Sequence, residues 1–320
     1  MRVFSMAALA AGLMVVGAGA DAAWAQAGVT VLPLPDAAAY PEGVTVDPST
    51  GAIYTASANT GVVVRVDADS GAATIVGDPL GKADAGGPPT SMTLGLKADG
   101  EGRLWVAGGR SGTMHVVDIA TGRLLARFTT PEGRWLINDV ALTQDAAYFT
   151  DTLRPVMWRV PRDAVQDAAL EPWLSFEGTP LEYGEDSNLN GVVATPDGRH
   201  LIAIHMKAGR LFRIDTQTKA VAAIDTGDAA LDGGDGLALK DNRLFVVRQW
   251  TGDIVALDLS DDLSSATEVK RIKPAELAWP ATAAIRGDRL IVANTQFNRR
   301  EAGDPVLPFS LTSIPLSAFD

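Results

Sequence analysis

The sequence contains no cysteine and only three histidines among its 320 residues. Without cysteine the chain can form no disulfide bond and no thiolate metal site, and it offers no lipidation site. Basic clusters are also absent, and the formal net charge is −12. An acidic chain without such a cluster is a poor candidate for binding nucleic acid or an anionic membrane surface. We therefore expect a small-molecule substrate or ligand, while the sequence does not predict an oligomeric state.

One long apolar run occurs, near the beginning of the chain. Met1 and Arg2 supply a positive charge, residues 4–20 are apolar, and Ala23-Trp24-Ala25 has the small-x-small pattern of a signal peptidase site. A membrane anchor is the alternative, but the run is shorter than the ~20 residues that a spanning helix needs. We therefore expect residues 1–25 to be a signal peptide, and residues 26–320 to form one domain that is periplasmic or secreted.

No helical periodicity of useful length follows the apolar run, and a strand pattern takes its place. Residues 188–215 contain three short strands separated by the turns Pro196-Asp197-Gly198 and Lys207-Ala208-Gly209. The second strand of this pattern recurs along the chain, at residues 52–56, 103–107, 147–150, 200–204, 243–247 and 289–293. The third strand recurs with it, at residues 62–67, 113–118, 156–161, 210–215, 253–258 and 311–316. Copies lie about 43 to 52 residues apart, the spacing of propeller blades.

Six repeats of a strand meander predict an all-β, six-bladed β-propeller with four-stranded blades. The last copy ends without a fourth strand, whereas residues 29–34 form an unassigned strand before the first copy. We expect this N-terminal strand to complete the last blade and close the ring. A β-sandwich, or two of them, is the competing fold, but sandwiches do not repeat a whole meander six times.

The first strand of each blade lines the central channel of a propeller, so equivalent positions on these strands define a candidate site. Counting back from the second strands gives one position per blade: Glu42, Thr93, Asn138, Asn190, Asp235 and Ala281. Oxygen donors of this kind, without His or Cys, suit Ca²⁺ better than zinc or copper. Taken singly, each could be a turn residue that leads into a strand. Together, Glu42, Asn138, Asn190 and Asp235 predict a calcium site.

Four short motifs carry a family resemblance: Pro41-Glu42-Gly43, Ile137-Asn138-Asp139, Leu189-Asn190-Gly191-Val192 and Gly234-Asp235-Gly236-Leu237. In order and spacing they resemble the metal motifs of the senescence marker protein/gluconolactonase/luciferin-regenerating enzyme family, over nearly the whole chain after residue 25. The resemblance implies a six-bladed, calcium-dependent propeller that hydrolyses lactones or related esters. It also implies that Glu42, Asn190 and Asp235 bind the metal and that Asn138 is a further ligand or a substrate contact. Asp235 takes the position of the acid/base or nucleophile.

The sequence departs from this family at Leu136, where sugar-lactone hydrolases carry an arginine. A sugar-acid substrate is therefore in doubt, and a less polar ester or lactone becomes plausible. Other candidates lie where second strands return to the metal-bearing face. His205 is a candidate for proton transfer, and Arg248 and Lys207 are candidates for binding an anionic substrate, in addition to the substrate contact that the resemblance implies for Asn138. Each could instead pack between blades or pair with a neighbouring acid.

Two other functions stay open at this point. The protein could be a non-catalytic propeller that binds a ligand or protein, with calcium as a structural ion. A quinone-dependent dehydrogenase also uses a propeller and calcium, but no residue set argues specifically for it. Two long connections, residues 77–92 and 177–188, are candidates for loops that cover the site or set its specificity.

Overall fold

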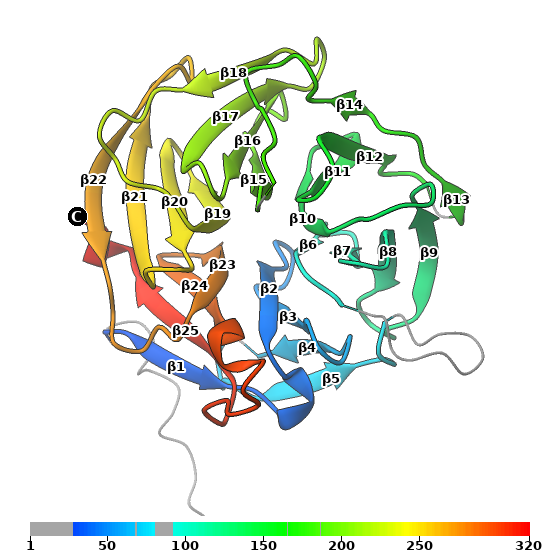
Figure 1. The fold of residues 1–320 in the computed structure, drawn as a ribbon. Coiled ribbons are helices and arrows are strands. Elements are labelled where there is room, and N and C mark those ends of the chain that lie inside the picture. Colours follow the sequence, from blue (N-terminus) through cyan, green and yellow to red (C-terminus); the bar gives the residue numbers. More distant parts are fainter. Residues whose placement is uncertain (1–27, 68, 81–91, 165, 186) are drawn as a thin grey trace, which may run out of the picture.

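Each of the six sequence repeats folds into an antiparallel sheet, and the six sheets stand in a ring around a central axis (Figure 1). The structure is a computed structural model that describes residues 28–67, 69–80, 92–164, 166–185 and 187–320. Turn glycines and alternating apolar residues specify three short strands per repeat, and one such sheet cannot bury both of its faces alone. The predicted all-β, six-bladed propeller is confirmed. The predicted signal peptide, residues 1–25, lies outside the described residues.

The blades are numbered in chain order, and in each the first strand lies nearest the axis. Blades 1 to 3 contain β2 (Pro41–Val46), β3 (Ile53–Ser57), β4 (Val63–Val66) and β5 (Ala73–Val76); β6 (Leu96–Ala98), β7 (Arg103–Ala107), β8 (Thr113–Asp118) and β9 (Leu124–Thr129); and β10 (Ile137–Leu142), β11 (Ala146–Asp151), β12 (Val156–Pro161) and β14 (Leu174–Ser175). Blades 4 to 6 contain β15 (Leu189–Ala194), β16 (His200–His205), β17 (Arg210–Asp215) and β18 (Val221–Ile224); β19 (Gly234–Lys240), β20 (Arg243–Arg248), β21 (Asp253–Leu259) and β22 (Ala266–Ile272); and β23 (Pro280–Arg286), β24 (Arg289–Asn294), β25 (Ser310–Pro315) and β1 (Thr30–Pro33).

The N-terminal strand closes the ring. β1 pairs antiparallel with β25, with Thr30 opposite Ser313 and Pro33 opposite Ser310. The contact continues beyond the strand, where the Leu34 N–H donates to the Phe309 carbonyl at 2.8 Å. The predicted closure of the last blade by residues 29–34 is therefore confirmed.

Blade 2 has a short fifth strand that the repeat pattern does not predict. β13 (Ala168–Ala169) comes from the segment after β12 of blade 3, yet it pairs parallel with β9 at the outer edge of blade 2. Two contacts hold this segment: the Asp167 carboxylate accepts the Arg127 N–H at 2.7 Å, and the Leu170 N–H donates to the Thr129 carbonyl at 2.9 Å. The excursion covers the unpaired edge of β9, and blade 3 retains a two-residue outer strand, β14.

The hydrophobic core is divided among the interfaces between blades. Six clusters of buried side chains occur, and each joins two neighbouring blades. Trp105 of blade 2 and Trp158 of blade 3, both fully buried, lie in the cluster between those blades. Helical structure in the described residues is limited to three short 3₁₀ turns, η1 (Asp36–Ala38), η2 (Phe297–Arg299) and η3 (Leu316–Phe319). None of the described helices is long and apolar enough to cross a membrane.

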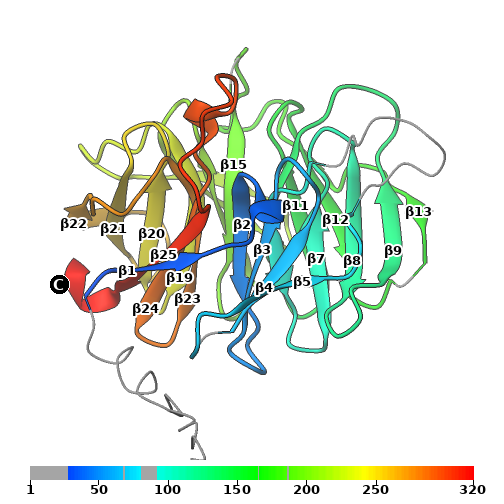
Figure 2. The ribbon, with the colours of Figure 1, turned by 90° about the horizontal axis from the view of Figure 1, so that it is seen from below.

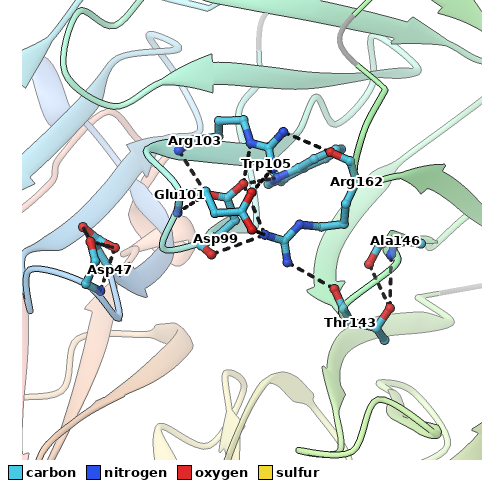
Figure 3. Close-up of polar contacts among 9 residues, drawn as sticks. Asp47, Asp99, Glu101, Arg103, Trp105, Thr143, Ala146 and Arg162 are labelled. Atoms are coloured by element: carbon cyan, nitrogen blue, oxygen red, sulfur yellow. Dashed lines mark hydrogen bonds and ion pairs between the residues drawn. The ribbon is translucent and has the colours of Figure 1, made fainter.

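The ring has two distinct faces (Figure 2). We call the face at which the innermost strands begin the top face, and the face at which they end the bottom face. On the bottom face, Asp99 joins blades 2 and 3 through Arg103 and Arg162 (Figure 3). Arg103 Nε lies 2.6 Å from Asp99 Oδ2, and Arg103 Nη1 donates to the Arg162 carbonyl at 3.0 Å. Trp105 Nε1 adds a third donor to Asp99 Oδ2 at 3.2 Å.

Candidate functional site

The candidate site is built on a β-bulge that recurs at the top of the innermost strands. In five blades the register between the first and second strands shifts across one dipeptide: Glu42-Gly43, Asn138-Asp139, Asn190-Gly191, Asp235-Gly236 and Ala281-Thr282. A bulge re-aims side chains and strengthens the local twist. The repeat therefore places one side chain per blade at an equivalent point near the axis.

In blade 2 the equivalent residue is Leu94 rather than Thr93. Ala98 pairs with Leu104 across residues 99–103, whereas Val46 pairs with Ile53 across residues 47–52, so the blade 2 turn is one residue shorter. The prediction of Thr93 was wrong for this reason. Its hydroxyl instead donates to the Ser57 carbonyl at 2.7 Å. We call the six equivalent residues the axial ring: Glu42, Leu94, Asn138, Asn190, Asp235 and Ala281.

The glycines of the sequence motifs have a structural role beside any functional one. A Cβ on Gly43 would lie 2.4 Å from the Leu94 carbonyl oxygen of the next blade, and one on Gly191 would lie 2.4 Å from the Asp235 carbonyl oxygen. Only glycine allows the backbones of neighbouring blades to approach this closely. The motif glycines thus hold the axial ring together whether or not it binds a metal.

Residues that directly follow the second strands orient the polar side chains of the axial ring. Asn138 Nδ2 donates to Thr152 Oγ1 at 2.9 Å, Asn190 Nδ2 lies 3.3 Å from Met206 Sδ, and the Gln249 side-chain amide donates to the Asp235 carboxylate. The sequence analysis missed Thr152, Met206 and Gln249. Each follows a second strand by one residue, so the repeat position itself is the signal that could have identified them.

Two buried oxygen atoms of the axial ring have no hydrogen-bond partner among the described residues. They are Glu42 Oε2 and Asn138 Oδ1. The side chains of Glu42, Asn138, Asn190 and Asp235 are all at most 5 % exposed. Because buried polar atoms normally have partners, two orphaned acceptors in one ring indicate a missing donor or cation.

The electrostatics of the axial ring point the same way. Burial, and then the negative charge of Asp139, raise the pKa of Asp235 well above its ordinary value, although hydrogen bonds from Asn190 and Gln249 act to lower it. Burial also raises the pKa of Glu42, followed by the charges of Asp235 and Asp139. Carboxylates whose pKa values are raised by burial and by each other's charge are stabilised in the ionised form by a nearby cation.

The residues present fit a hard cation, provided that amide oxygens take part. Within the described ranges, no three or more His, Asp or Glu residues are arranged to hold a metal ion. A cation on the axis would therefore be held by the carboxylates of Glu42 and Asp235 and the amides of Asn138 and Asn190. Ca²⁺ accepts such oxygen ligands and fills its remaining positions with water.

The last residue of a second strand, one position before the residue that orients the axial ring, holds a loop of the top face. Each bonds to the loop that leads into the first strand of its own blade: Ser57 to Ala39, Asp151 to Leu136, His205 to Glu182, Arg248 to Asp232 and Asn294 to Ala278. This shared pattern gives His205 and Arg248 a structural role at equivalent positions of the fold.

His205 already uses both ring nitrogens. Nδ1 accepts the Ala208 N–H at 3.3 Å, so Nε2 carries the proton that is shared with the Glu182 carbonyl at 3.2 Å. Burial lowers the pKa of His205, and the side chain is 5 % exposed. To transfer a proton, His205 would have to release one of these partners, and its catalytic role stays a prediction.

The two basic candidates differ in their surroundings. Arg248 is 6 % exposed and engages Asp232 at 2.8 Å and Asp253 at 3.0 Å, so its guanidinium belongs to a buried ion-pair network. Lys207 is exposed, and its ammonium lies 5.6 Å from the centre of the Trp250 ring. Substrate binding by either stays a prediction.

The long connections that we expected to cover the site are partly described. Of residues 77–92, positions 81–91 lie outside the described residues. In the second connection, Leu181 is fully buried and the Tyr183 hydroxyl donates to the Asp151 carbonyl at 2.6 Å, which ties this segment to blade 3. Leu136, where the related lactone hydrolases carry arginine, packs against the core between blades 2 and 3.

Comparison with known proteins supports the fold and leaves the family open. No protein-family model matches the chain, and no curated protein sequence matches it. Among solved structures, a calcium-binding regucalcin from Agrobacterium tumefaciens strain C58 is 17% identical with a TM-score of 0.62, and the match covers 90% of this chain and 93% of that one. Virginiamycin B lyase from Staphylococcus aureus is 13% identical with a TM-score of 0.58, over 90% of this chain and 99% of that one. A chain of a nidogen/laminin complex is 13% identical with a TM-score of 0.59, over 82% and 89%. At identities this low, the matches show a shared propeller fold and give no information about activity.

Proposed function

We propose that this protein is an exported, calcium-dependent hydrolase that acts on a lactone or a related ester. The observation that carries the proposal is the axial ring itself, where two buried carboxylates and two amides converge and two oxygen atoms have no partner in the described part of the chain. The resemblance of the four motifs to the gluconolactonase-type family adds to it, as does the fold shared with a calcium-binding regucalcin. Export rests on the signal-like residues 1–25 alone.

The residues of the axial ring would have separate roles in hydrolysis. When bound, Ca²⁺ would supply a Lewis acid for the carbonyl oxygen of the substrate. Asp235 would then orient or deprotonate a water molecule, or attack directly as a nucleophile. Gln249 holds the Asp235 carboxylate, and Thr152 fixes the Asn138 amide so that its oxygen stays available. Leu136 packs against the core between blades 2 and 3 and supplies no arginine at this position, which favours an ester or lactone that is less polar than a sugar acid.

A calcium titration of the chelated protein tests this proposal. We would follow the melting temperature and the hydrolysis of a panel of lactones and aryl esters in the same samples. An increase in both with calcium is expected. If neither changes, the axial ring is not a calcium site and the proposal fails.

The same titration separates the second candidate function, a binding propeller with a structural calcium ion. His205 and Arg248 favour this candidate, because their hydrogen-bonding groups are engaged by the protein itself. The fold shared with a chain of a nidogen/laminin complex fits it as well. A calcium-dependent rise in melting temperature without turnover of any substrate would support it. Substitution of Asp235 by Asn then distinguishes a reacting group from a ligand, because only the former removes turnover while calcium binding is retained.

A further inference from the structure

A cavity lies at the outer part of the interface between blades 1 and 2, away from the axial ring. It measures about 520 Å³, which is within the range of small-molecule sites. One wall is residues 77–80, which follow β5, and the other is the β8–β9 turn together with side chains of those two strands. A Cβ on Gly77 would lie 2.6 Å from Gly122 Cα, so the two walls touch at this point. β5 and β9 are the fourth strands of their blades, whereas the axial ring is on the first strands (Figure 1).

His115 of β8 is a buried polar residue in the wall of this cavity. It is 3 % exposed, and it lies directly opposite Arg127 of β9, so the two side chains are neighbours on one face of the sheet. That face is turned toward blade 1, because Val106, the partner of His115 in β7, belongs to the hydrophobic cluster between blades 1 and 2. Both His115 and Arg127 line the cavity.

A chain of hydroxyl groups fixes which nitrogen of His115 carries the proton. The Ser111 hydroxyl donates to the Gly108 carbonyl at 2.7 Å, so its oxygen accepts the proton of the Thr113 hydroxyl, 2.6 Å away. The Thr113 oxygen then accepts from His115 Nε2 at 3.1 Å. Burial, and then the charge of Arg127, lower the pKa of His115 to about 4, so the ring is neutral near neutral pH. Nδ1 is therefore a buried acceptor, and no described residue donates to it.

The charged groups of the cavity favour a ligand with a single negative charge. Arg123 and Arg127 line it, and within the described ranges neither guanidinium forms a hydrogen bond or an ion pair. Asp78, which is exposed, is the one acid that the described residues contribute to the wall. Two positive charges and one negative charge leave a net charge of +1. Because arginine binds carboxylates through charge-assisted hydrogen bonds, a carboxylate suits the two guanidinium groups.

We propose that this cavity binds a small hydroxy-carboxylate, whose carboxylate pairs with Arg127 and Arg123 and whose hydroxyl group donates to His115 Nδ1. A monocarboxylate matches the net charge of the wall, and its hydroxyl supplies the donor that the buried nitrogen lacks within the described residues. Hydrolysis of a lactone also yields a hydroxy-carboxylate, so the proposed hydrolase would release a ligand of this class. The inference does not depend on that activity, because none of the residues that carry it belongs to the axial ring.

Calorimetry with lactate and propionate on chelated, calcium-free protein tests the site, because propionate is lactate without the hydroxyl group. Lactate is expected to bind about tenfold more tightly than propionate, the effect of one hydrogen bond to a buried acceptor. Arg127→Gln should weaken the binding of both acids about tenfold, since it removes a charged donor. Arg65→Gln is the matched control and should leave both affinities unchanged, because Arg65 is on blade 1, pairs with Asp67 at 3.8 Å and does not line the cavity.

His115→Phe separates a ligand contact from a structural role, because phenylalanine has a similar size and offers no acceptor. The preference for lactate over propionate should disappear in this variant, while propionate binds as it does to the parent protein. A second measurement needs no variant and covers the case in which phenylalanine prevents folding. 2-Methoxypropionate keeps the oxygen atom of lactate but cannot donate a hydrogen bond, so it should bind the parent protein more weakly than lactate does.

Several outcomes would overturn the inference. Absence of lactate binding, or equal affinity for lactate and propionate in the parent protein, would remove the site or His115 from it, and tighter binding of inorganic phosphate than of lactate would contradict the class of ligand. Loss of lactate binding in Asp235→Asn would place the acid at the axial ring instead. Lactate binding that responds to Arg127 and His115, in a protein that neither binds calcium nor hydrolyses lactones, would support this cavity while the proposed function fails.

Discussion

Two sets of buried carboxylates in this propeller behave in opposite ways. On the bottom face, the Asp99 side chain is fully buried but is paired with Arg103 and Arg162 and bonded to Trp105 (Figure 3). Burial acts to raise the pKa of Asp99, but hydrogen bonds from Glu101, Arg103 and Trp105 prevail and lower it. In the axial ring, burial and neighbouring carboxylates raise the pKa of Glu42 and Asp235, and no arginine of the described ranges pairs with either group.

The difference separates a group that joins blades from a group that is prepared for a ligand. A buried carboxylate with a full set of donors is satisfied by the protein and has nothing further to bind. A buried carboxylate that is repelled by its neighbours is stabilised by something that the chain does not supply. Groups with perturbed pKa values cluster at functional sites, and for this reason we take the axial ring as the candidate functional site.

The largest effect is expected from Asp99→Ala, which removes the buried carboxylate shared by Arg103 and Arg162 and leaves them only the exposed carboxylate of Glu101. Loss of one member of a buried ion-pair network should lower the free energy of unfolding by about 3 kcal/mol. Denaturant unfolding measures the change. Asp69→Ala is the matched control, because Asp69 pairs with Arg286 at 3.1 Å while 93% of its side chain is exposed. Equal effects of the two substitutions would show that the Asp99 network does not join the blades.

The next effect is expected from Gly191→Ala, which tests the close approach of blades 4 and 5 at the axial ring. The added Cβ would meet the Asp235 carbonyl oxygen at 2.4 Å, so the backbone has to shift and the free energy of unfolding should fall by about 2 kcal/mol. Gly184→Ala is the control, because its nearest neighbour, Asn188 Oδ1, would lie 4.0 Å away. A neutral Gly191→Ala would mean that the motif glycine serves the ligand and not the packing.

A smaller effect of the opposite sign is expected from Asp235→Asn in metal-free protein. Removal of one buried charge should raise the free energy of unfolding, because burial and the charge of Asp139 disfavour the ionised form of Asp235. In saturating calcium the order should reverse, because the parent protein gains about 2.7 kcal/mol at a calcium concentration of 100 times its Kd. Melting curves with and without calcium provide both values. A destabilised Asp235→Asn in the absence of metal would place Asp235 with Asp99, as a satisfied structural group.

Acidification distinguishes the two sets by the pH at which each contribution disappears. The lowered pKa of Asp99 gives stability that is present above its ordinary value of 3.8 and is lost as the pH falls through the lowered pKa. The raised pKa values of Glu42 and Asp235 impose a cost that is present at higher pH and is relieved as the pH falls through those raised values. In metal-free samples, the gap between the parent protein and Glu42→Gln should therefore close as the pH falls through the raised pKa of Glu42. The gap for Asp99→Ala should persist until the pH falls below about 4.

Most of the fold could be predicted from the sequence because turn residues and alternating apolar residues specify each repeat locally. The six meanders and the closure by residues 29–34 follow from local patterns, and both are present. The parallel strand β13 could not be predicted, because it depends on an unpaired edge in the neighbouring blade and not on its own two alanines. Thr93 was misplaced because a register set by one turn shifts when that turn loses a single residue.

The candidate site could be predicted only in part. Glu42, Asn138, Asn190 and Asp235 share a repeat position, and counting along the chain is enough to find them. The partners that orient them, Thr152, Met206 and Gln249, have no common chemistry and become visible only as contacts.

The pairing of β1 with β25 has a consequence for when the protein becomes functional. Thr30 and Ser313 are partners although nearly the whole described chain separates them, so this contact closes a very long loop and is expected to form late in folding. The axial ring draws its polar members from four blades and needs the glycine contacts between them. A chain with well-formed blades but an open ring would therefore contain the sheets, while the residues of the axial ring would not be brought together. If the proposed calcium site is real, a molecule that is damaged near either terminal strand is expected to lose cation binding before it loses its secondary structure.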